Sequence, residues 1–210
     1  MQRQSNERKR SLEALTSRFE SSRDKIQPYL AGRGLAGAAE RFRLGYVEPA
    51  DDIPRRYWHR LAIPYLTPTG PVQIRYRRLV EDDSPKFLGD TGEVVTLYNA
   101  QAALHTPGPL ILCEGEPDVW AVTLLTGYPA VGIPGARAWE SHPYFSRCFV
   151  GIRPLILAGD GDDAGDTLAT AVAQDIPEVQ HVRLPDGEDA GSILARDPAE
   201  FLHRCGLAVA

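Results

Sequence analysis

Acidic residues follow two apolar runs of the sequence at the points where the runs end. Leu110–Cys113 is followed directly by Glu114, and Leu155–Ala158 is followed after one glycine by Asp160 and then Asp162. Short uninterrupted apolar runs are typical of strands that are buried on both faces of a parallel sheet. Because the carboxyl ends of parallel strands meet at one edge of the sheet, these acids should lie close together.

Two further acids, Asp186 and Asp189, stand in the turn that ends another predicted strand at residues 181–184. Neighbouring carboxylates repel one another, and a hard divalent cation relieves that repulsion. Mg²⁺ favours a few carboxylates together with water and substrate phosphates, and no His stands in these loops to favour zinc. The pattern therefore predicts a divalent-metal site for phosphoryl transfer, either nucleotide addition or phosphodiester cleavage.

The acids differ in how strongly they point to a metal. We expect Glu114, Asp160 and Asp162 to hold it and to carry the chemistry. Asp118, one helical turn beyond Glu114, could point back at the site or only favour the dipole of its helix. For four further acids we favour the role of helix cap or loop residue: Glu116, Asp163, Asp166 and Glu188.

The elements around these residues alternate between strand and helix. Strands are predicted at residues 110–113, 130–133, 155–158 and 181–184, with helical segments between them. This alternation predicts an α/β domain with a parallel sheet flanked by helices.

The preceding half of the chain has a different pattern. Residues 60–66 and 72–79 flank a turn and predict a β-hairpin, and helices are predicted within 11–19, 22–30 and 36–42. We expect three segments: an N-terminal tail and helix (1–27), a basic α+β subdomain (28–106) and the parallel α/β domain (107–210).

Charge is divided unevenly between the two halves. Residues 1–106 hold 17 Lys and Arg against 13 Asp and Glu, whereas residues 107–210 hold 6 against 15. A basic part joined to an acidic part suits a protein that binds a polyanion with one and cations with the other. Chance clustering on solvated surfaces would give the same totals.

Several classes of protein are excluded by composition. The three cysteines are far apart and form no Cys-x-x-Cys pair, which excludes a zinc ribbon and argues against a disulfide framework. The polar N-terminus is unlike a signal peptide, and no run approaches the roughly 18 apolar residues of a membrane span. We expect a reduced, cytoplasmic protein.

These motifs resemble a known family. Glu114-Gly115 and Asp160-Gly161-Asp162-Asp163-Ala164-Gly165 are similar to the Toprim signature of topoisomerases, primases and OLD-type nucleases. Leu184–Asp189 resembles the Leu-Pro-x-Gly-x-Asp segment of DnaG-type bacterial and phage primases. Three upstream segments resemble the N-terminal half of the primase polymerase core, in the same order: Tyr29–Leu35, Ser84–Leu88 and Leu97–Ala100.

The resemblance, which covers roughly residues 28–205, implies a DNA primase core that joins ribonucleoside triphosphates on single-stranded DNA with Mg²⁺ or Mn²⁺. It implies metal roles for Glu114, Asp160 and Asp162, and accessory roles for Asp118 and Asp189. The nucleic-acid or nucleotide contacts that we expect are Arg78, Lys86, Arg75, Arg33 and Asn99. Lys86 precedes Phe87, and a cation beside an aromatic ring is typical of single-strand binding.

The sequence departs from the family pattern in three ways. Gly191 stands where many primases carry a second aspartate, the three cysteines do not provide the family's zinc-binding module, and no Gly-x-x-x-x-Gly-Lys-Ser/Thr loop indicates a fused helicase. We therefore expect a replicative helicase and a zinc-binding module on other chains, in a bacterial or phage-infected cell. Two alternatives stay open, a Toprim-type metal-dependent nuclease and a non-catalytic DNA-binding subunit of a replication complex.

Overall fold

The computed structural model describes residues 6–89 and 94–208, which form two compact units that divide between Val94 and Val95. The sequence predicted the division at residues 106–107 instead. Residues 95–104 belong to the second unit because Tyr98 and Gly132 exchange two backbone hydrogen bonds, of 2.8 and 3.0 Å, and Leu97 is buried in that unit's core. The helix of the predicted N-terminal segment 1–27 packs within the first unit.

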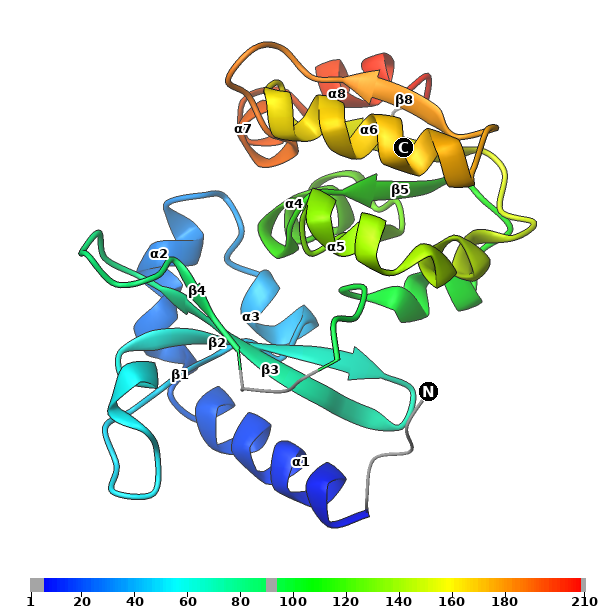
Figure 1. Cartoon of the computed structure of the whole chain (residues 1–210). Helices are drawn as coiled ribbons and strands as arrows, with labels where there is room; N and C mark the ends of the chain where they lie inside the picture. The colour runs from blue at the N-terminus through cyan, green and yellow to red at the C-terminus, as the bar shows by residue number, and fades with distance from the viewer. Residues whose placement is uncertain (1–5, 90–93, 209–210) are drawn as a thin grey trace. The chain divides into compact units, whose positions relative to one another are not determined.

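The first unit combines short helices with an antiparallel sheet (Figure 1). Its helices are α1 (Asn6–Glu20), α2 (Gln27–Ala31) and α3 (Ala38–Arg41), with 3-10 turns η1 (Arg23–Ile26) and η2 (Arg55–Tyr57). Its strands, in sheet order, are β1 (Gly45–Tyr46), β2 (Arg60–Thr67), β3 (Gly70–Arg78) and β4 (Phe87–Leu88). Strands β2 and β3 form the predicted hairpin.

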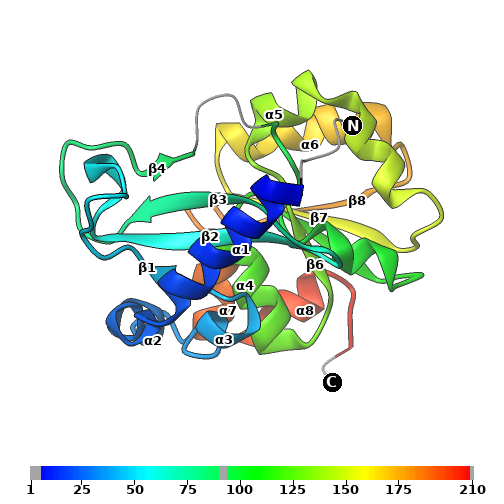
Figure 2. The same ribbon diagram turned by 90° about the horizontal axis from the view of Figure 1, so that it is seen from below.

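Helix α1 crosses the hairpin, as Figure 2 shows. Leu12 and Phe19 of α1 are buried against Ile74 and Tyr76 of β3. The helix begins before the predicted range 11–19, because its charged first turns contain good helix formers but no apolar periodicity from which to predict them.

The second unit contains the predicted parallel sheet. The strands are β5 (Leu110–Cys113), β6 (Ala130–Gly132), β7 (Leu155–Gly159) and β8 (Gln180–Arg183), paired in parallel in the order β6-β5-β7-β8. The helices are α4 (Glu116–Thr126), α5 (Ala136–Ser141), α6 (Asp163–Asp175), α7 (Ala190–Arg196) and α8 (Pro198–Arg204), with 3-10 segments η3 (Ala100–Leu104) and η4 (Pro143–Phe149). The α/β prediction is confirmed.

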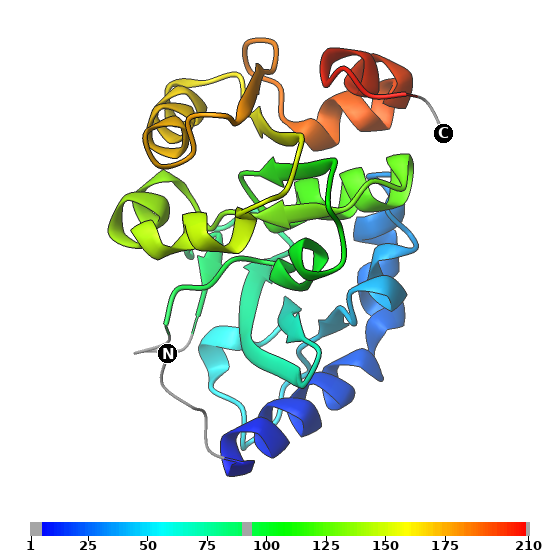
Figure 3. The same ribbon diagram turned by 90° about the vertical axis from the view of Figure 1, so that its right-hand side faces the viewer.

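Helices cover both faces of this sheet (Figure 3). Helices α5 and α6 pack together on one face, and α4, α7 and α8 pack together on the other. Side chains alternate along a strand, so Leu110 and Leu112 face the core formed with Trp139, Phe149 and Leu168. Because both faces are covered, the open positions lie at the strand ends.

The loops after β7 and β8 are joined directly at the carboxyl edge of this sheet. The Gly161 N–H donates to Glu188 O, and the Gly187 N–H donates to Gly161 O, each at 2.9 Å. A Cβ on Gly161 would lie 1.9 Å from Pro185 O. Only glycine therefore allows the two acid-bearing loops to approach this closely.

Among the described residues, no helix is both long enough and apolar enough to span a bilayer.

Substitution of Gly161 by Ala should destabilise the fold by about 1–3 kcal/mol, because the new methyl group overlaps a backbone oxygen that is hard to move. Gly115→Ala is the matched control in the neighbouring loop, where a Cβ would meet its nearest neighbours at 3.4 and 3.5 Å. It should lower the free energy of unfolding by less than Gly161→Ala does, by at most about 1 kcal/mol for the loss of glycine at the N-cap of α4. Urea unfolding measures both, and equal losses would contradict the close approach.

Candidate metal centre and nucleic-acid surface

The carboxylate of Glu114 and the backbone of Asp160 are in direct contact. Glu114 follows β5 and Asp160 follows the neighbouring strand β7, and the Asp160 N–H donates to Glu114 Oε1 at 2.9 Å. Burial raises the pKa of Glu114, and the charges of Asp162 and Asp166 raise it further. The parallel pairing of the two strands thus brings the two acids together, as predicted.

Asp160 lies at the centre of the acidic cluster. Burial raises its pKa to about 8, with further contributions from the charges of Asp118, Glu114, Asp189 and Asp162. Its Oδ1 is buried and accepts no hydrogen bond from the described residues. A buried carboxylate oxygen without a donor is costly, so a cation bound at this atom would supply the missing interaction.

Asp118, in the first turn of α4, points back toward the cluster. Its side chain is buried, and its Oδ1 accepts the Gly191 N–H at 3.0 Å. Burial, followed by the charge of Asp189, raises its pKa to about 7. Of the two roles considered for Asp118, this geometry favours a member of the acid cluster. Metal binding by Asp118 stays a prediction.

Asp162 and Asp189 each cap a helix. Asp162 Oδ1 accepts the Gly165 N–H at 2.8 Å at the start of α6, and Asp189 Oδ1 accepts the Ser192 N–H at 2.7 Å at the start of α7. Both side chains are exposed. Capping engages one oxygen of each carboxylate, and the other oxygen takes no part in the cap. Their metal roles stay predictions.

The acids to which we gave capping or loop roles do not supply these caps. Asp166 forms an ion pair with Arg183 at 2.9 Å, and Glu188 pairs with Arg196 at 2.7 Å. Asp163 is an exposed first-turn residue of α6, whereas Glu116 in α4 is 3% exposed. Asp186 pairs with Arg183 at 2.7 Å. Spacing alone did not distinguish the capping acid from its neighbour.

The cluster fits a hard divalent cation in an open site. Its donors are all carboxylates, burial and then their mutual repulsion raise the pKa values of Asp118 and Asp160, and the Asp160 Oδ1 accepts no hydrogen bond from the described residues. Across residues 6–89 and 94–208, no three His, Cys, Asp or Glu side chains are placed so that they could hold a metal ion by themselves. An open set of acids suits Mg²⁺, which keeps waters and takes phosphate oxygens as further ligands.

Gly165 is a site residue that the sequence reasoning quoted in a motif but did not select. A Cβ there would lie 2.2 Å from Asp160 O and 2.7 Å from Glu114 Oε1. The first turn of α6 therefore packs directly against the acids. The final glycine of the Asp-Gly-Asp-Asp-Ala-Gly segment was the available signal.

Aromatic rings and arginines alternate on the surface of the first unit. The Tyr29 ring lies 3.9 Å from the Arg33 guanidinium and 5.9 Å from that of Arg77. The Phe87 ring lies 5.0 Å from Arg77 and 4.6 Å from Arg75. We call these residues the cation–aromatic surface. Its stacking planes and positive charges are the groups that bind single strands.

The predicted nucleic-acid residues of the first unit lie on or beside this surface. Arg33 and Arg75 belong to it, and the exposed Lys86 immediately precedes Phe87. Tyr29 and Arg77 were not selected, because only the folded chain brings α2 beside β3. The Arg78 guanidinium instead contacts Glu81, Asp82 and Ser84 in the following loop. The nucleic-acid contacts of these residues stay predictions.

Asn99 lies in the second unit. It adopts a left-handed conformation with φ of 54°, and its Nδ2 donates to Ala130 O at 2.8 Å. This bond ties the start of η3 to β6. A nucleotide contact through its other side-chain atom stays a prediction.

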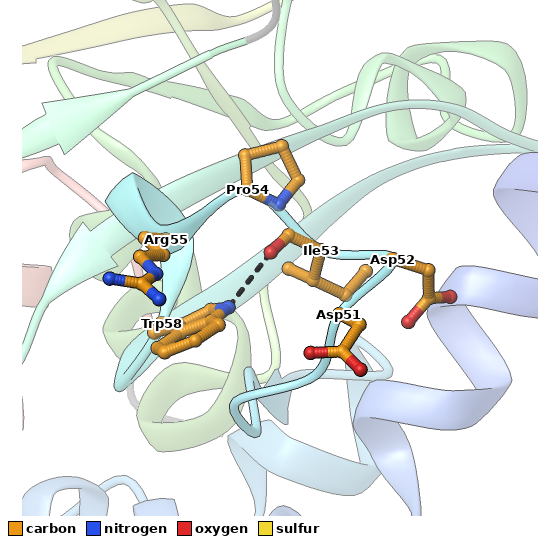
Figure 4. Close-up of a pocket in the computed structure, with 6 residues that line it drawn as sticks. All are labelled: Asp51, Asp52, Ile53, Pro54, Arg55 and Trp58. Atoms are coloured by element: carbon orange, nitrogen blue, oxygen red, sulfur yellow. Dashed lines mark hydrogen bonds between the residues drawn. The ribbon is translucent and has the colours of Figure 1, made fainter.

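A surface hollow of the first unit lies beside none of the predicted residues (Figure 4). It has a volume of about 390 Å³ and is lined by residues 51–55 and Trp58. The Trp58 indole donates to Ile53 O at 2.9 Å, and Asp52 pairs with Arg18 at 2.7 Å.

Stability of the metal-free protein should fall as the pH rises. Asp118 and Asp160 have folded pKa values of about 7 and about 8, above the ordinary value of 3.8. Between those limits the folded state binds more protons than the unfolded state, so protonation favours folding. We expect the free energy of unfolding in chelator to fall by about 1–3 kcal/mol from pH 5.5 to pH 8.5, after allowance for solvent screening.

The double variant Asp118→Asn/Asp160→Asn serves as the comparison, because asparagine keeps the acceptor for the Gly191 N–H and removes both charges. Its stability should vary less with pH than that of the wild type. Identical pH profiles from urea unfolding would contradict the raised pKa values.

Mg²⁺ should stabilise the wild-type protein, because a ligand that binds only the folded state raises the free energy of unfolding, by about 2.7 kcal/mol at a hundred times its Kd. Asp160→Asn should abolish most of this gain while leaving the protein in chelator at least as stable as the wild type. Glu140→Gln, an exposed residue of α5, is the control and should keep the full gain. A full Mg²⁺ response from Asp160→Asn would exclude Asp160 as a ligand.

The chain is similar in sequence to a phage protein and in fold to solved structures. No family model matches the chain. The Gene 57 protein of Mycobacterium phage D29 is 37% identical over 148 residues, which cover 68% of this chain and 94% of that protein.

Two solved structures share the fold. A DnaG primase catalytic domain bound to single-stranded DNA is similar with a TM-score of 0.75 at 22% identity, over 96% of this chain and 82% of that one. The primase fragment of the bacteriophage T7 primase-helicase protein gives a TM-score of 0.65 at 21% identity, over 84% and 73%. The chain therefore belongs to the family of the Gene 57 protein of Mycobacterium phage D29 and has the fold of the DnaG-type primase catalytic core.

Proposed function

We propose that the protein is a DNA primase catalytic core that makes short RNA primers on single-stranded DNA. The observation that carries the proposal is the acid cluster around Asp160, whose Oδ1 accepts no hydrogen bond from the described residues. The cluster lies at the carboxyl edge of the parallel sheet, in a chain with the fold of primase catalytic cores. The cation–aromatic surface on the same chain supports a nucleic-acid substrate, and single-stranded DNA is the ligand named for one of the similar structures.

The acids would have two roles at the metal centre, as metal ligands and as accessory acids. Glu114, Asp160 and Asp162 would hold Mg²⁺ or Mn²⁺, with Asp118 and Asp189 as accessory acids. When bound, the cation supplies Lewis-acid polarisation of phosphoryl oxygens and neutralises their charge. Glu114 accepts the Asp160 N–H through Oε1, which leaves its Oε2 to take a proton. Because burial raises the pKa of Glu114, its carboxylate is a better base than an ordinary glutamate.

The template strand would lie on the cation–aromatic surface. Tyr29 and Phe87 offer ring faces to bases, and Arg33, Arg77 and Lys86 offer charge to phosphates. Such contacts read no sequence, because every base has a π-face and phosphates are uniform. A start site would therefore be chosen by another module.

Further partners follow from the same proposal. Ribonucleoside triphosphates are the second substrate, and a replicative helicase and a separate zinc-binding module would act with the chain. The T7 protein named above joins a primase and a helicase, which supports the helicase partner. We expect the protein to act in the cytoplasm of a bacterial or phage-infected cell.

The test is primer synthesis from labelled ribonucleoside triphosphates on single-stranded DNA with Mg²⁺ or Mn²⁺. The wild type should make oligoribonucleotides, alone or with a zinc-binding module. Asp160→Asn should lower the rate by at least about a hundredfold, because removal of a preorganised electrostatic group costs roughly that much. Glu140→Gln should retain the wild-type rate, and urea unfolding establishes that both variants are folded.

Two other outcomes separate the alternatives. Metal-dependent cleavage of labelled DNA or RNA without nucleotides would identify a nuclease instead. DNA binding with neither synthesis nor cleavage would identify a non-catalytic subunit. The specific observation in favour of that last outcome is the Asp118–Gly191 hydrogen bond, which occupies one oxygen of Asp118 with a backbone donor.

A further inference from the structure

Two arginines stand directly opposite each other in the hairpin of the first unit. Arg60 of β2 is the register partner of Arg78 of β3. Like charges at opposed positions destabilise an antiparallel pair. Arg60 is only 6% exposed, and the Nε of Arg78 is buried and donates to no acceptor among the described residues. The opposed guanidinium groups therefore need acceptors from outside the two strands.

Both guanidinium groups hold the loop formed by residues 81–86. Arg60 Nη2 donates to Ser84 Oγ at 2.6 Å and its Nη1 donates to Pro85 O at 2.8 Å. Arg78 donates to the carbonyl oxygens of Asp82 and Ser84. Ser84 Oγ in turn donates to Asp82, whose pKa is held low first by that bond. The loop thus supplies neutral acceptors to Arg60, and the carboxylates of Glu81 and Asp82 pair with Arg78.

The loop ends at Lys86, whose backbone is fixed while its side chain is exposed. The backbone N–H of Arg78 donates to Lys86 O at 3.0 Å. The carbonyl of the preceding residue, Pro85, accepts from the Arg60 guanidinium, and the Lys86 side chain is exposed. Phe87, the next residue, pairs with Arg77 in the sheet. The ammonium group of Lys86 therefore extends from a rigid base beside the cation–aromatic surface.

We propose that Arg60 is a positioning residue that presents Lys86 to the phosphate backbone of single-stranded nucleic acid. The proposal rests on the proposed function insofar as that function requires single-strand binding. Its physical basis is preorganisation, because a loop that is ordered before binding loses less conformational entropy on binding. A lysine at position 60 would keep the charge but lose the planar fork that contacts Arg56 O, Ser84 and Pro85 together.

The experiment measures binding of a fluorescein-labelled oligothymidylate by anisotropy over a series of salt concentrations. Arg60→Lys should raise the Kd roughly three- to tenfold and reduce the salt slope by about 0.7, the share of one phosphate contact on a single strand. Lys86→Ala should produce the same two changes. The double variant should bind no more weakly than Lys86→Ala alone, because Arg60 acts only through Lys86.

Controls separate positioning from general damage. Arg41→Lys, at an exposed arginine of α3, should leave the Kd and the slope unchanged. Hydrogen exchange of Arg60→Lys should increase in the 81–88 segment and stay at wild-type rates in α1. If Arg60→Lys fails to fold, Ser84→Ala removes one of the bonds to Arg60 and should change the Kd and slope in the same direction by less.

The outcomes are distinguishable from failure of the proposed function. Additive losses in the double variant, or an unchanged salt slope in folded Arg60→Lys or Ser84→Ala, would overturn the positioning role even if primers are made. A wild-type protein that makes no primers but shows the coupled losses would support the positioning role and contradict primase activity. A wild type that binds no oligothymidylate would overturn both.

Discussion

The mutual repulsion of carboxylates at one sheet edge is the constraint on which the second unit depends. Asp160 is surrounded by the charges of Asp118, Glu114, Asp189 and Asp162. Burial and these charges together raise its pKa to about 8. The fold holds these acids together through backbone contacts, such as the Asp160 N–H to Glu114 Oε1 bond. The clustered carboxylates can therefore bind a divalent cation, which in turn can bind phosphate oxygens.

The sheet order and the glycines make that arrangement possible. The central strands β5 and β7 deliver Glu114 and Asp160 side by side, and β8 brings Asp189 from a distant part of the sequence. Gly161 and Gly165 allow the loops and the first turn of α6 to approach the acids within distances that a Cβ would forbid. In the first unit, buried Arg60 performs a comparable task for the 81–86 loop, by holding backbone oxygens in place.

The sequence predicted most of the second unit and less of the first. Apolar runs that end in acid predicted the parallel sheet and the meeting of Glu114 with Asp160, because strand order and strand polarity determine both. Asp162 and Asp189 were selected as ligands without their capping roles, since a cap depends on where the helix starts to within one residue. Arg60, Arg77 and Tyr29 were missed because their contacts join α2, β2, β3 and the following loop, which no periodicity relates.

The most direct measurement is a crystal structure of the protein soaked in Mn²⁺, with anomalous scattering used to locate the ion. The account predicts an ion bound to Asp160 Oδ1, the buried oxygen that lacks a donor, with Glu114 or Asp162 as a further ligand. Its remaining ligands should be waters, which triphosphate oxygens would replace. An anomalous peak elsewhere, with none at these acids, would contradict the central claim that this edge of the sheet is a metal centre.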